Sequence, residues 1–264
     1  MVEVFGYVAS FCVGLILGLI GGGGSILSIP ILVYLFTVEV IEATAYSLFI
    51  VGTTSLVGSI QKYKHSLVDF RVGLIFGLPS ILSKFTTRKW IVPSIPDVLL
   101  QTESFVLTKR LFMLGIFSIM VIIAATSMIR NNNKPHTYHG KAKDVWLGVQ
   151  GIFIGFLTGI AGLGGGFIIV PTLLFFAKIP FKKAVGTALF IIALNSLTGF
   201  LGDLSNLDVA WPFLLTITGI AITGIFIGNI YSQRVSGLQL KKSFGWFILV
   251  MGIAILIRES LVLL

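Results

Sequence analysis

The chain has 264 residues, of which 56% are hydrophobic and only 11% are charged, and its mean hydropathy is +1.02. Soluble domains have about a quarter of their residues charged, and no soluble fold of this size could bury so much apolar surface. The composition therefore excludes a soluble protein and predicts an integral membrane protein in a lipid bilayer. The net charge of +9 comes from basic residues in short loops between apolar segments, where they orient helices, so nucleic acid is not an expected partner.

Apolar stretches without charge and without alternation predict membrane helices rather than a membrane barrel. The first half of the chain has such stretches at residues 4–20, 26–36, 40–60, 70–83 and 111–129. The second half has them at residues 146–161, 167–177, 184–201, 211–231 and 243–257. The second stretch of each half is too short to cross a hydrocarbon core, which needs about 20 residues. It is either half of a re-entrant hairpin or part of a broken span, which predicts about 8–10 membrane segments.

The two halves are related by an internal duplication. "GLILGLIGGGGSILSIPIL" at residues 14–32 aligns without a gap to "GFLTGIAGLGGGFIIVPTL" at residues 155–173, with a constant offset of 141. The glycine and proline positions coincide, which chance similarity between apolar helices would not preserve. The duplication predicts three parts: a first transmembrane repeat (1–129), a basic connecting loop (130–145) and a second transmembrane repeat (146–264).

Loop charges predict that the two repeats enter the membrane from opposite sides. Each repeat has an odd number of crossings, three or five. The loop at 130–145 is rich in Lys and Arg, which places it in the cytoplasm, and the basic loop at 178–183 then falls inside as well. The loop with Asp203 and Asp208 falls outside, whereas the stretch 84–110, also expected outside, is basic and disagrees. The expected fold class is an all-α integral membrane protein with two inverted-topology repeats, each with a glycine-broken or re-entrant segment.

Runs of glycine interrupt both repeats between an apolar helix and the short stretch that follows it. Each glycine disfavours helix by about 1 kcal/mol relative to alanine, and non-helical backbone at membrane depth survives only when buried in protein or lining a cavity. The short helices would direct free N–H groups and positive dipole ends at the breaks, which favours an anion. The predicted substrate-binding residues here are Gly21, Gly22, Gly23, Gly24, Ser25, Gly162, Gly164, Gly165 and Gly166, with Pro30 and Pro171 as structural residues of the broken helices.

Helix packing alone is the alternative role for these glycines. It is the role that we assign to the spaced glycine pairs at 73/77 and 224/228, since small residues let membrane helices approach closely.

Polar side chains at matching positions of the third stretches extend the candidate site. Thr54 overlays Asn195, and Ser55 overlays Ser196. Hydroxyl and carboxamide groups can donate hydrogen bonds to an oxyanion, although interhelical hydrogen bonding is an alternative role for each residue.

The predicted spans contain no acidic, basic or histidine residue away from their ends. Proton relays, catalytic groups and metal ligands need such residues at membrane depth. We therefore expect no catalytic residue, no metal, no cofactor and no enzyme activity. Lys62, Lys64 and His65, which follow the third stretch, are interpreted as positive-inside anchors rather than as a cytoplasmic mouth that attracts anions.

The doubled motif resembles the TauE/SafE sulfite exporter family. It reads "GLIGGGGSILSIPIL" and "GIAGLGGGFIIVPTL", and each copy is followed by an alanine-containing helix start, "EATAYSLF" and "KAVGTALF". The resemblance implies a multi-pass permease of the plasma membrane for sulfite, sulfonate-derived or other organosulfur anions. "ATAYSLF" departs from the "AVGT" of the second half. The family motif falls on Gly21, Gly23, Gly24, Pro30, Gly162, Gly164, Gly165 and Pro171.

The sequence thus predicts a transporter for a small anion bound near the midplane at the two glycine breaks. A channel-like anion pore and a non-transporting membrane assembly protein are the alternatives. Assembly as a homo-oligomer is compatible with either.

Overall fold

The computed structural model describes residues 2–96, 98–102, 105–130, 141–161, 166–204 and 208–261. Its helices are α1 (Val2–Ile20), α2 (Gly24–Tyr34), α3 (Val40–Lys64), α4 (Phe70–Thr86), α5 (Val92–Ser94), α6 (Lys109–Arg130), α7 (Lys141–Ala161), α8 (Gly166–Thr172), α9 (Phe181–Asp203), α10 (Trp211–Arg234) and α11 (Gly237–Leu261). The π-helical turns are η1 (Thr87–Ile91) and η2 (Leu173–Ala177), and the strands are β1 (Val98–Thr102) and β2 (Phe105–Thr108).

Each predicted apolar stretch coincides largely with a helix, which confirms the expectation of a helical membrane protein. Among the described residues, three helices are long and apolar enough to cross a bilayer: Ile41–Lys64, Phe181–Asp203 and Trp211–Arg234. The antiparallel hairpin of β1 and β2, between α5 and α6, is the departure from an all-α chain.

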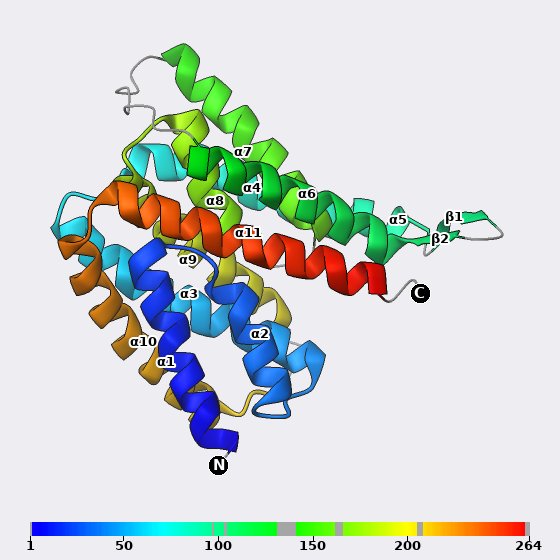
Figure 1. Cartoon of the computed structure of the whole chain (residues 1–264), viewed down its shortest axis with the longest axis horizontal. Coiled ribbons are helices and arrows are strands. Elements are labelled where there is room, and N and C mark those ends of the chain that lie inside the picture. Colours follow the sequence, from blue (N-terminus) through cyan, green and yellow to red (C-terminus); the bar gives the residue numbers. More distant parts are fainter. Residues whose placement is uncertain are drawn as a thin grey trace.

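Four helices of the first half of the chain each pack along a helix of the second half (Figure 1). α1 packs along α10 and α4 along α7, while α3 packs along α9 and α6 along α11. In the sequence alignment α1 corresponds to α7 and α4 to α10. The first two contacts are therefore one contact made twice with the halves exchanged, and the contact of α3 with α9 joins a helix to its own counterpart.

Glycine contacts repeat this pairing at matching positions of the two halves. A Cβ atom added to Gly14 would lie 1.9 Å from the carbonyl oxygen of Ala221, and one added to Gly155 would lie 2.3 Å from that of Ser80. Gly14 and Gly155 are 141 residues apart, as are Ser80 and Ala221. The register of the duplication is therefore also present in the helix contacts.

Gly73, Gly224 and Gly228 serve helix packing, as predicted, whereas a Cβ added to Gly77 would make only ordinary contact, 3.4 Å from Ile191 Cγ1. Added Cβ atoms on Gly224 and Gly228 would lie 2.2 and 2.3 Å from carbonyl oxygens of α1, and one on Gly73 would lie 2.8 Å from the ring of Phe190 in α9.

Replacing Gly14 by alanine should loosen the contact between α1 and α10. The new Cβ would overlap a backbone oxygen, which cannot move aside as the tip of a side chain can, so we expect a loss of about 1–3 kcal/mol. Gly219→Ala is the matched control, because nothing lies within 4 Å of its added Cβ. That variant should be as stable as the wild type or more stable. Thermal unfolding of the purified proteins in detergent measures both, and equal melting temperatures would contradict the packing role.

The loop between α3 and α4 is attached to α9 through Asp69. Its carboxylate caps α4 by accepting a hydrogen bond from the Val72 N–H at 3.1 Å, and it pairs with Lys183 Nζ at 2.9 Å. Its own N–H donates to Thr187 Oγ1 at 2.9 Å. Desolvation alone would raise the pKa of Asp69, but the hydrogen bond from Lys183, that from Val72 and the charge of Lys183 together hold the pKa below its usual value.

Asp69→Asn should lower stability at neutral pH while preserving the cap, since asparagine also caps helices well. Both partners are partly exposed, with 24% and 35% of their side-chain surface accessible, so we expect a loss of only about 0.5–1 kcal/mol. Because folding lowers the pKa of Asp69, the carboxylate stabilises the protein above its unfolded pKa, and this is lost as the pH falls through the folded value. The difference in melting temperature between the wild type and Asp69→Asn should persist from pH 7 to about 4 and disappear in more acidic buffer. A gap independent of pH would contradict this origin.

Candidate functional site

The first glycine run interrupts the chain between α1 and α2. α1 ends at Ile20, and Gly21 and Gly23 have φ angles of 71° and 89°, in the left-handed region that favours glycine. The chain reverses there, so that α2 runs back beside α1 (Figure 1). Gly21, Gly22, Gly23 and Gly24 are all buried.

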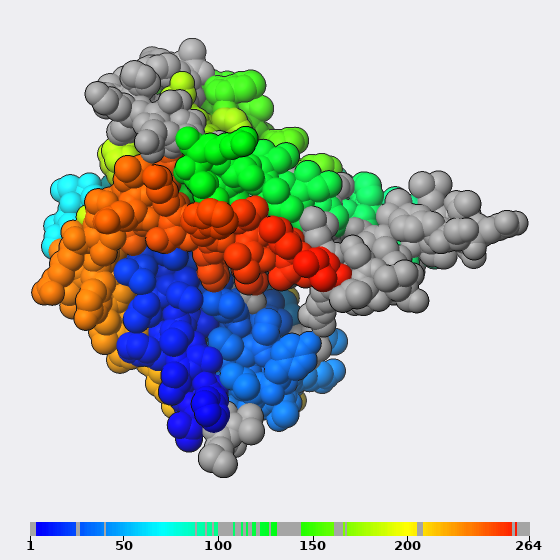
Figure 2. Space-filling view, in the orientation of Figure 1, coloured from blue at the N-terminus to red at the C-terminus, as the bar shows by residue number. Residues whose placement is uncertain are grey.

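Apolar side chains of α9 and α11 lie against this break. A Cβ on Gly21 would lie 2.6 Å from Val185 Cγ1 of α9, and one on Gly23 would lie 2.9 Å from Phe247 Cε1 of α11. Figure 2 shows α11, orange to red, lying across the adjoining ends of α1 and α2. The N–H of Gly21 donates to the Leu17 carbonyl at 2.7 Å, whereas those of Gly22 and Gly23 have no partner among the described residues. The break thus holds free donors in a protein interior.

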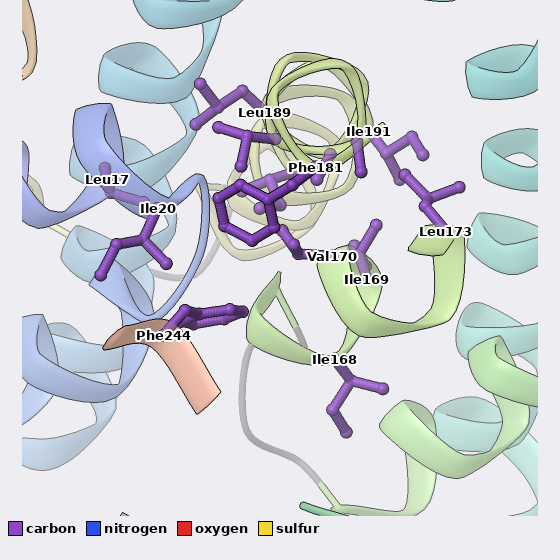
Figure 3. Close-up of a cluster of buried hydrophobic side chains, with 14 of the residues drawn as sticks. Leu17, Ile20, Ile168, Ile169, Val170, Leu173, Phe181, Leu189, Ile191 and Phe244 are labelled. Carbon is purple, nitrogen blue, oxygen red and sulfur yellow. The ribbon is translucent and has the colours of Figure 1, made fainter. Parts of the chain in front are cut away.

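The second glycine run adjoins α8. Gly162, Gly164 and Gly165 lie outside the described residues, and α8 begins at Gly166. A Cβ on Gly166 would lie 3.1 Å from the Ile192 side chain of α9. Figure 3 shows side chains from the end of α1, from α8 and from α9 gathering around Phe181 and Phe244. Gly21, before α2, and Gly166, at the start of α8, therefore both lie against α9. Pro30 lies inside α2 and Pro171 inside α8.

The predicted polar residues lie where α3 and α9 cross. A Cβ on Gly199 would approach Leu48 Cδ1 at 3.2 Å, and one on Gly58 would approach Leu189 Cδ1 at 3.2 Å. Midway between these two contacts lie residues 53–55 of α3 and 194–196 of α9. The structure thus brings together the parts of the two helices that contain Thr54, Ser55, Asn195 and Ser196, while Ser25 lies in the first turn of α2.

Two of these side chains are buried with unused hydrogen-bonding groups. Thr54 and Ser55 are both fully buried, and neither hydroxyl has a hydrogen-bond partner in the described structure. Ser196 is also buried, and Asn195 is half-buried. Leaving a buried polar group unpaired costs about 1–3 kcal/mol, so native proteins keep few of them. These two hydroxyls therefore indicate a place where a ligand or water supplies the partner.

A row of polar groups extends from these hydroxyls along one face of α3. Ser47, Thr54 and Gln61 recur every seven residues, which places them on the same side of the helix. The Ser47 hydroxyl is hydrogen bonded to that of Ser28 in α2, beside a small cavity between α1, α2, α3 and α10. The row therefore connects that cavity with the end of α3.

The structure contradicts the interpretation of Lys62 as a positive-inside anchor. Only 2% of its surface is accessible, and its ammonium donates to the Ser232 hydroxyl of α10. Lys64 and His65 are exposed, as expected of anchors. No pattern in its own segment indicates this burial, which depends on the contact with α10.

Comparison with known proteins decides the family. The sequence model of the sulfite exporter TauE/SafE family matches residues 7–255. The chain belongs to this family. The resemblance drawn from the doubled glycine–proline motif is confirmed, and the TauE/SafE assignment makes the chain a membrane transporter of that type.

Curated relatives of this TauE/SafE protein have the same general description. A probable membrane transporter protein of Bacillus subtilis, YunE, is 28% identical over 257 residues, covering 85% of this chain and 89% of the relative. A probable membrane transporter protein of Xylella fastidiosa is 28% identical, and the alignment covers 94% of this chain and 92% of the relative. A probable membrane transporter protein of Methanocaldococcus jannaschii is 27% identical, and the alignment covers 89% of this chain and 85% of the relative. No solved structure matches the chain.

Proposed function

We propose that this TauE/SafE protein transports a small oxyanion of the sulfite or sulfonate type across the plasma membrane. The substrate would bind near the midplane, between the glycine breaks and the crossing of α3 and α9. The observation that carries the proposal is the pair of fully buried, unpartnered hydroxyls of Thr54 and Ser55. Donors without partners suit an acceptor-only ligand such as an oxyanion.

The glycine breaks would add backbone donors to the same site. The free N–H groups of Gly22 and Gly23 precede α2, whose positive dipole end favours negative charge. In this proposal Gly162, Gly164, Gly165 and Gly166 do the same for α8, and Asn195 and Ser196 face the site from α9.

The proposal includes two inverted repeats, 1–129 and 146–264, joined by a cytoplasmic loop at 130–145. Support comes from the odd number of crossings in each half, from the basic loops and from the helix contacts that exchange the halves. Transporters of this design bind substrate between the repeats and alternate access by moving one against the other. The membrane potential, negative inside, would drive a monovalent anion outward with about 2.3 kcal/mol per 100 mV.

Flux into proteoliposomes tests the proposal. We expect the purified protein to move radiolabelled sulfite, with saturation as its concentration rises, and unlabelled methanesulfonate to compete. Flux that rises linearly without saturation would indicate a channel-like pore instead. Absence of flux for sulfite, sulfate and methanesulfonate, from correctly folded protein, would overturn the anion proposal and leave a membrane assembly role.

A further inference from the structure

A second polar cluster lies in the protein interior, where α3 and α10 end. Lys62 donates to the hydroxyl of Ser232, which in turn donates to the Asn229 carbonyl oxygen at 2.9 Å. The Asn229 side-chain amide donates to Gln61 Oε1. Asn229, Ser232 and Lys62 are each at most 3% exposed. This group, Gln61, Lys62, Asn229 and Ser232, is called the inner cluster below.

The inner cluster is positively charged and incompletely paired. In the described part of the chain no carboxylate pairs with Lys62, whereas Arg71 pairs with Asp144 and Lys183 with Asp69. An ammonium has three N–H donors, and Ser232 accepts one of them. The Asn229 Oδ1 atom is buried and has no hydrogen-bond partner among the described residues. A second cation is close by, because Lys182 Nζ donates to the Gln233 carbonyl at 3.0 Å, next to Ser232.

The inner cluster adjoins the first glycine break. A Cβ on Gly18 of α1 would lie 2.8 Å from the Asn229 backbone nitrogen. A Cβ on Gly186 of α9 would lie 3.1 Å from Lys62 Cβ, and the neighbouring Val185 is the residue that contacts Gly21. The cluster is thus enclosed by α1, α3, α9 and α10. Along α3, Lys62 follows Ser55 by seven residues, or about 10 Å.

A purely structural role for Lys62 would be to neutralise the carbonyl end of α10, where a cation is favourable. That role explains neither the complete burial of the ammonium nor its two spare donors, and exposed lysines could fill it. Ionisable residues inside membrane helices commonly mark substrate or ion pathways.

We propose that the inner cluster is an anion-binding site, separate from the hydroxyls of Thr54 and Ser55 and one step along the same pathway. Lys62 supplies the charge and two donors to a small oxyanion, and the Gln61 carboxamide contributes an NH2 group. Asn229 Oδ1 accepts a hydrogen bond from a hydroxyl group of the anion or from a water molecule bound to the anion. This inference rests on the proposed transport function.

Asn229→Asp gives the sharpest test. With the Gln61 amide turned so that its NH2 group donates to the new carboxylate, the negative charge lies in the same cluster as Lys62 and takes up the positive charge that the anion needs. We expect the melting temperature of this variant to equal or exceed that of the wild type. Its apparent affinity for sulfite, sulfate or methanesulfonate, measured from the rise in melting temperature that each anion causes, should fall at least tenfold. Lys62→Gln should weaken anion binding similarly, and Lys62→Arg should stay within about threefold of the wild type because it keeps the charge. Lys64→Gln is the control, since Lys64 is exposed on the same helix.

The outcomes separate the two proposals. If the wild type transports anions and Asn229→Asp, still folded, binds them with unchanged affinity, the inner cluster is not a binding site, although the proposed function stands. If Lys62→Gln and Ser232→Ala lose thermal stability equally and keep wild-type anion affinity, Lys62 is only structural. If the wild type neither binds nor moves any of the three anions, both proposals fall.

Discussion

Thr54→Val should leave the protein as stable as the wild type, or more stable, and should lower its apparent affinity for anions at least tenfold. Valine has nearly the shape of threonine, and the hydroxyl that it replaces is buried with no partner in the part of the chain that the structure describes. Removing an unpaired buried hydroxyl therefore relieves a desolvation cost of about 1–3 kcal/mol without breaking a protein hydrogen bond. Ser55→Ala should behave in the same way. The melting temperature and the concentration dependence of sulfite flux are measured on the same preparations.

Thr218→Val is the matched control for this pair. Thr218 is also buried in a membrane helix, but its hydroxyl donates to the Leu214 carbonyl at 2.7 Å. This variant should lose some stability and keep wild-type transport. The opposite pattern, in which Thr54→Val destabilises the protein and transports normally, would show that the Thr54 hydroxyl has a structural role and would remove the main support for the proposed site.

The helices could be predicted from the sequence because lipid allows few alternatives. In hydrocarbon every backbone group must be paired within the segment, so a long apolar run without alternation has one good conformation. The stretch 84–110 has no such constraint along its length, and its turn η1 and its hairpin of β1 and β2 depend on local contacts that composition does not reveal. The ends of helices were also missed. α3 continues four residues past the apolar run that ends at Ile60, and those residues include the buried Lys62.

The candidate site could be predicted in part, for a related reason. Glycine runs are visible in a sequence because they contradict the helix around them, and the duplication pairs Thr54 with Asn195. The packing partners of the breaks come from distant segments, Val185 and Phe247, and no local pattern specifies them. The inner cluster could not be predicted, because the burial of Lys62 depends on α10, 170 residues further along the chain.

Gly23→Asn distinguishes a glycine needed for its backbone angle from one needed to let an anion approach. Gly23 caps α2 with a φ of 89°, and asparagine tolerates the left-handed region better than other residues with a side chain. Its Cβ would meet the ring edge of Phe247, which lies at the far end of a side chain and can shift. We therefore expect Gly23→Asn to fold with a melting temperature near that of the wild type, and sulfite flux to fall at least tenfold because the side chain covers the free N–H groups.

Gly23→Ala and Gly24→Ala complete the comparison. Alanine at position 23 adds strain of about 1–2 kcal/mol at a positive φ, so it should lower both stability and flux. Alanine at position 24 meets the Leu17 side chain at 2.6 Å, but it begins α2 without a positive φ. Its defect should be mainly one of packing, so flux per folded molecule should fall less than in Gly23→Asn. If Gly23→Asn transported sulfite as the wild type does, the glycine would serve only the chain reversal, and the anion would have to bind through the side chains at the crossing of α3 and α9 instead of the backbone.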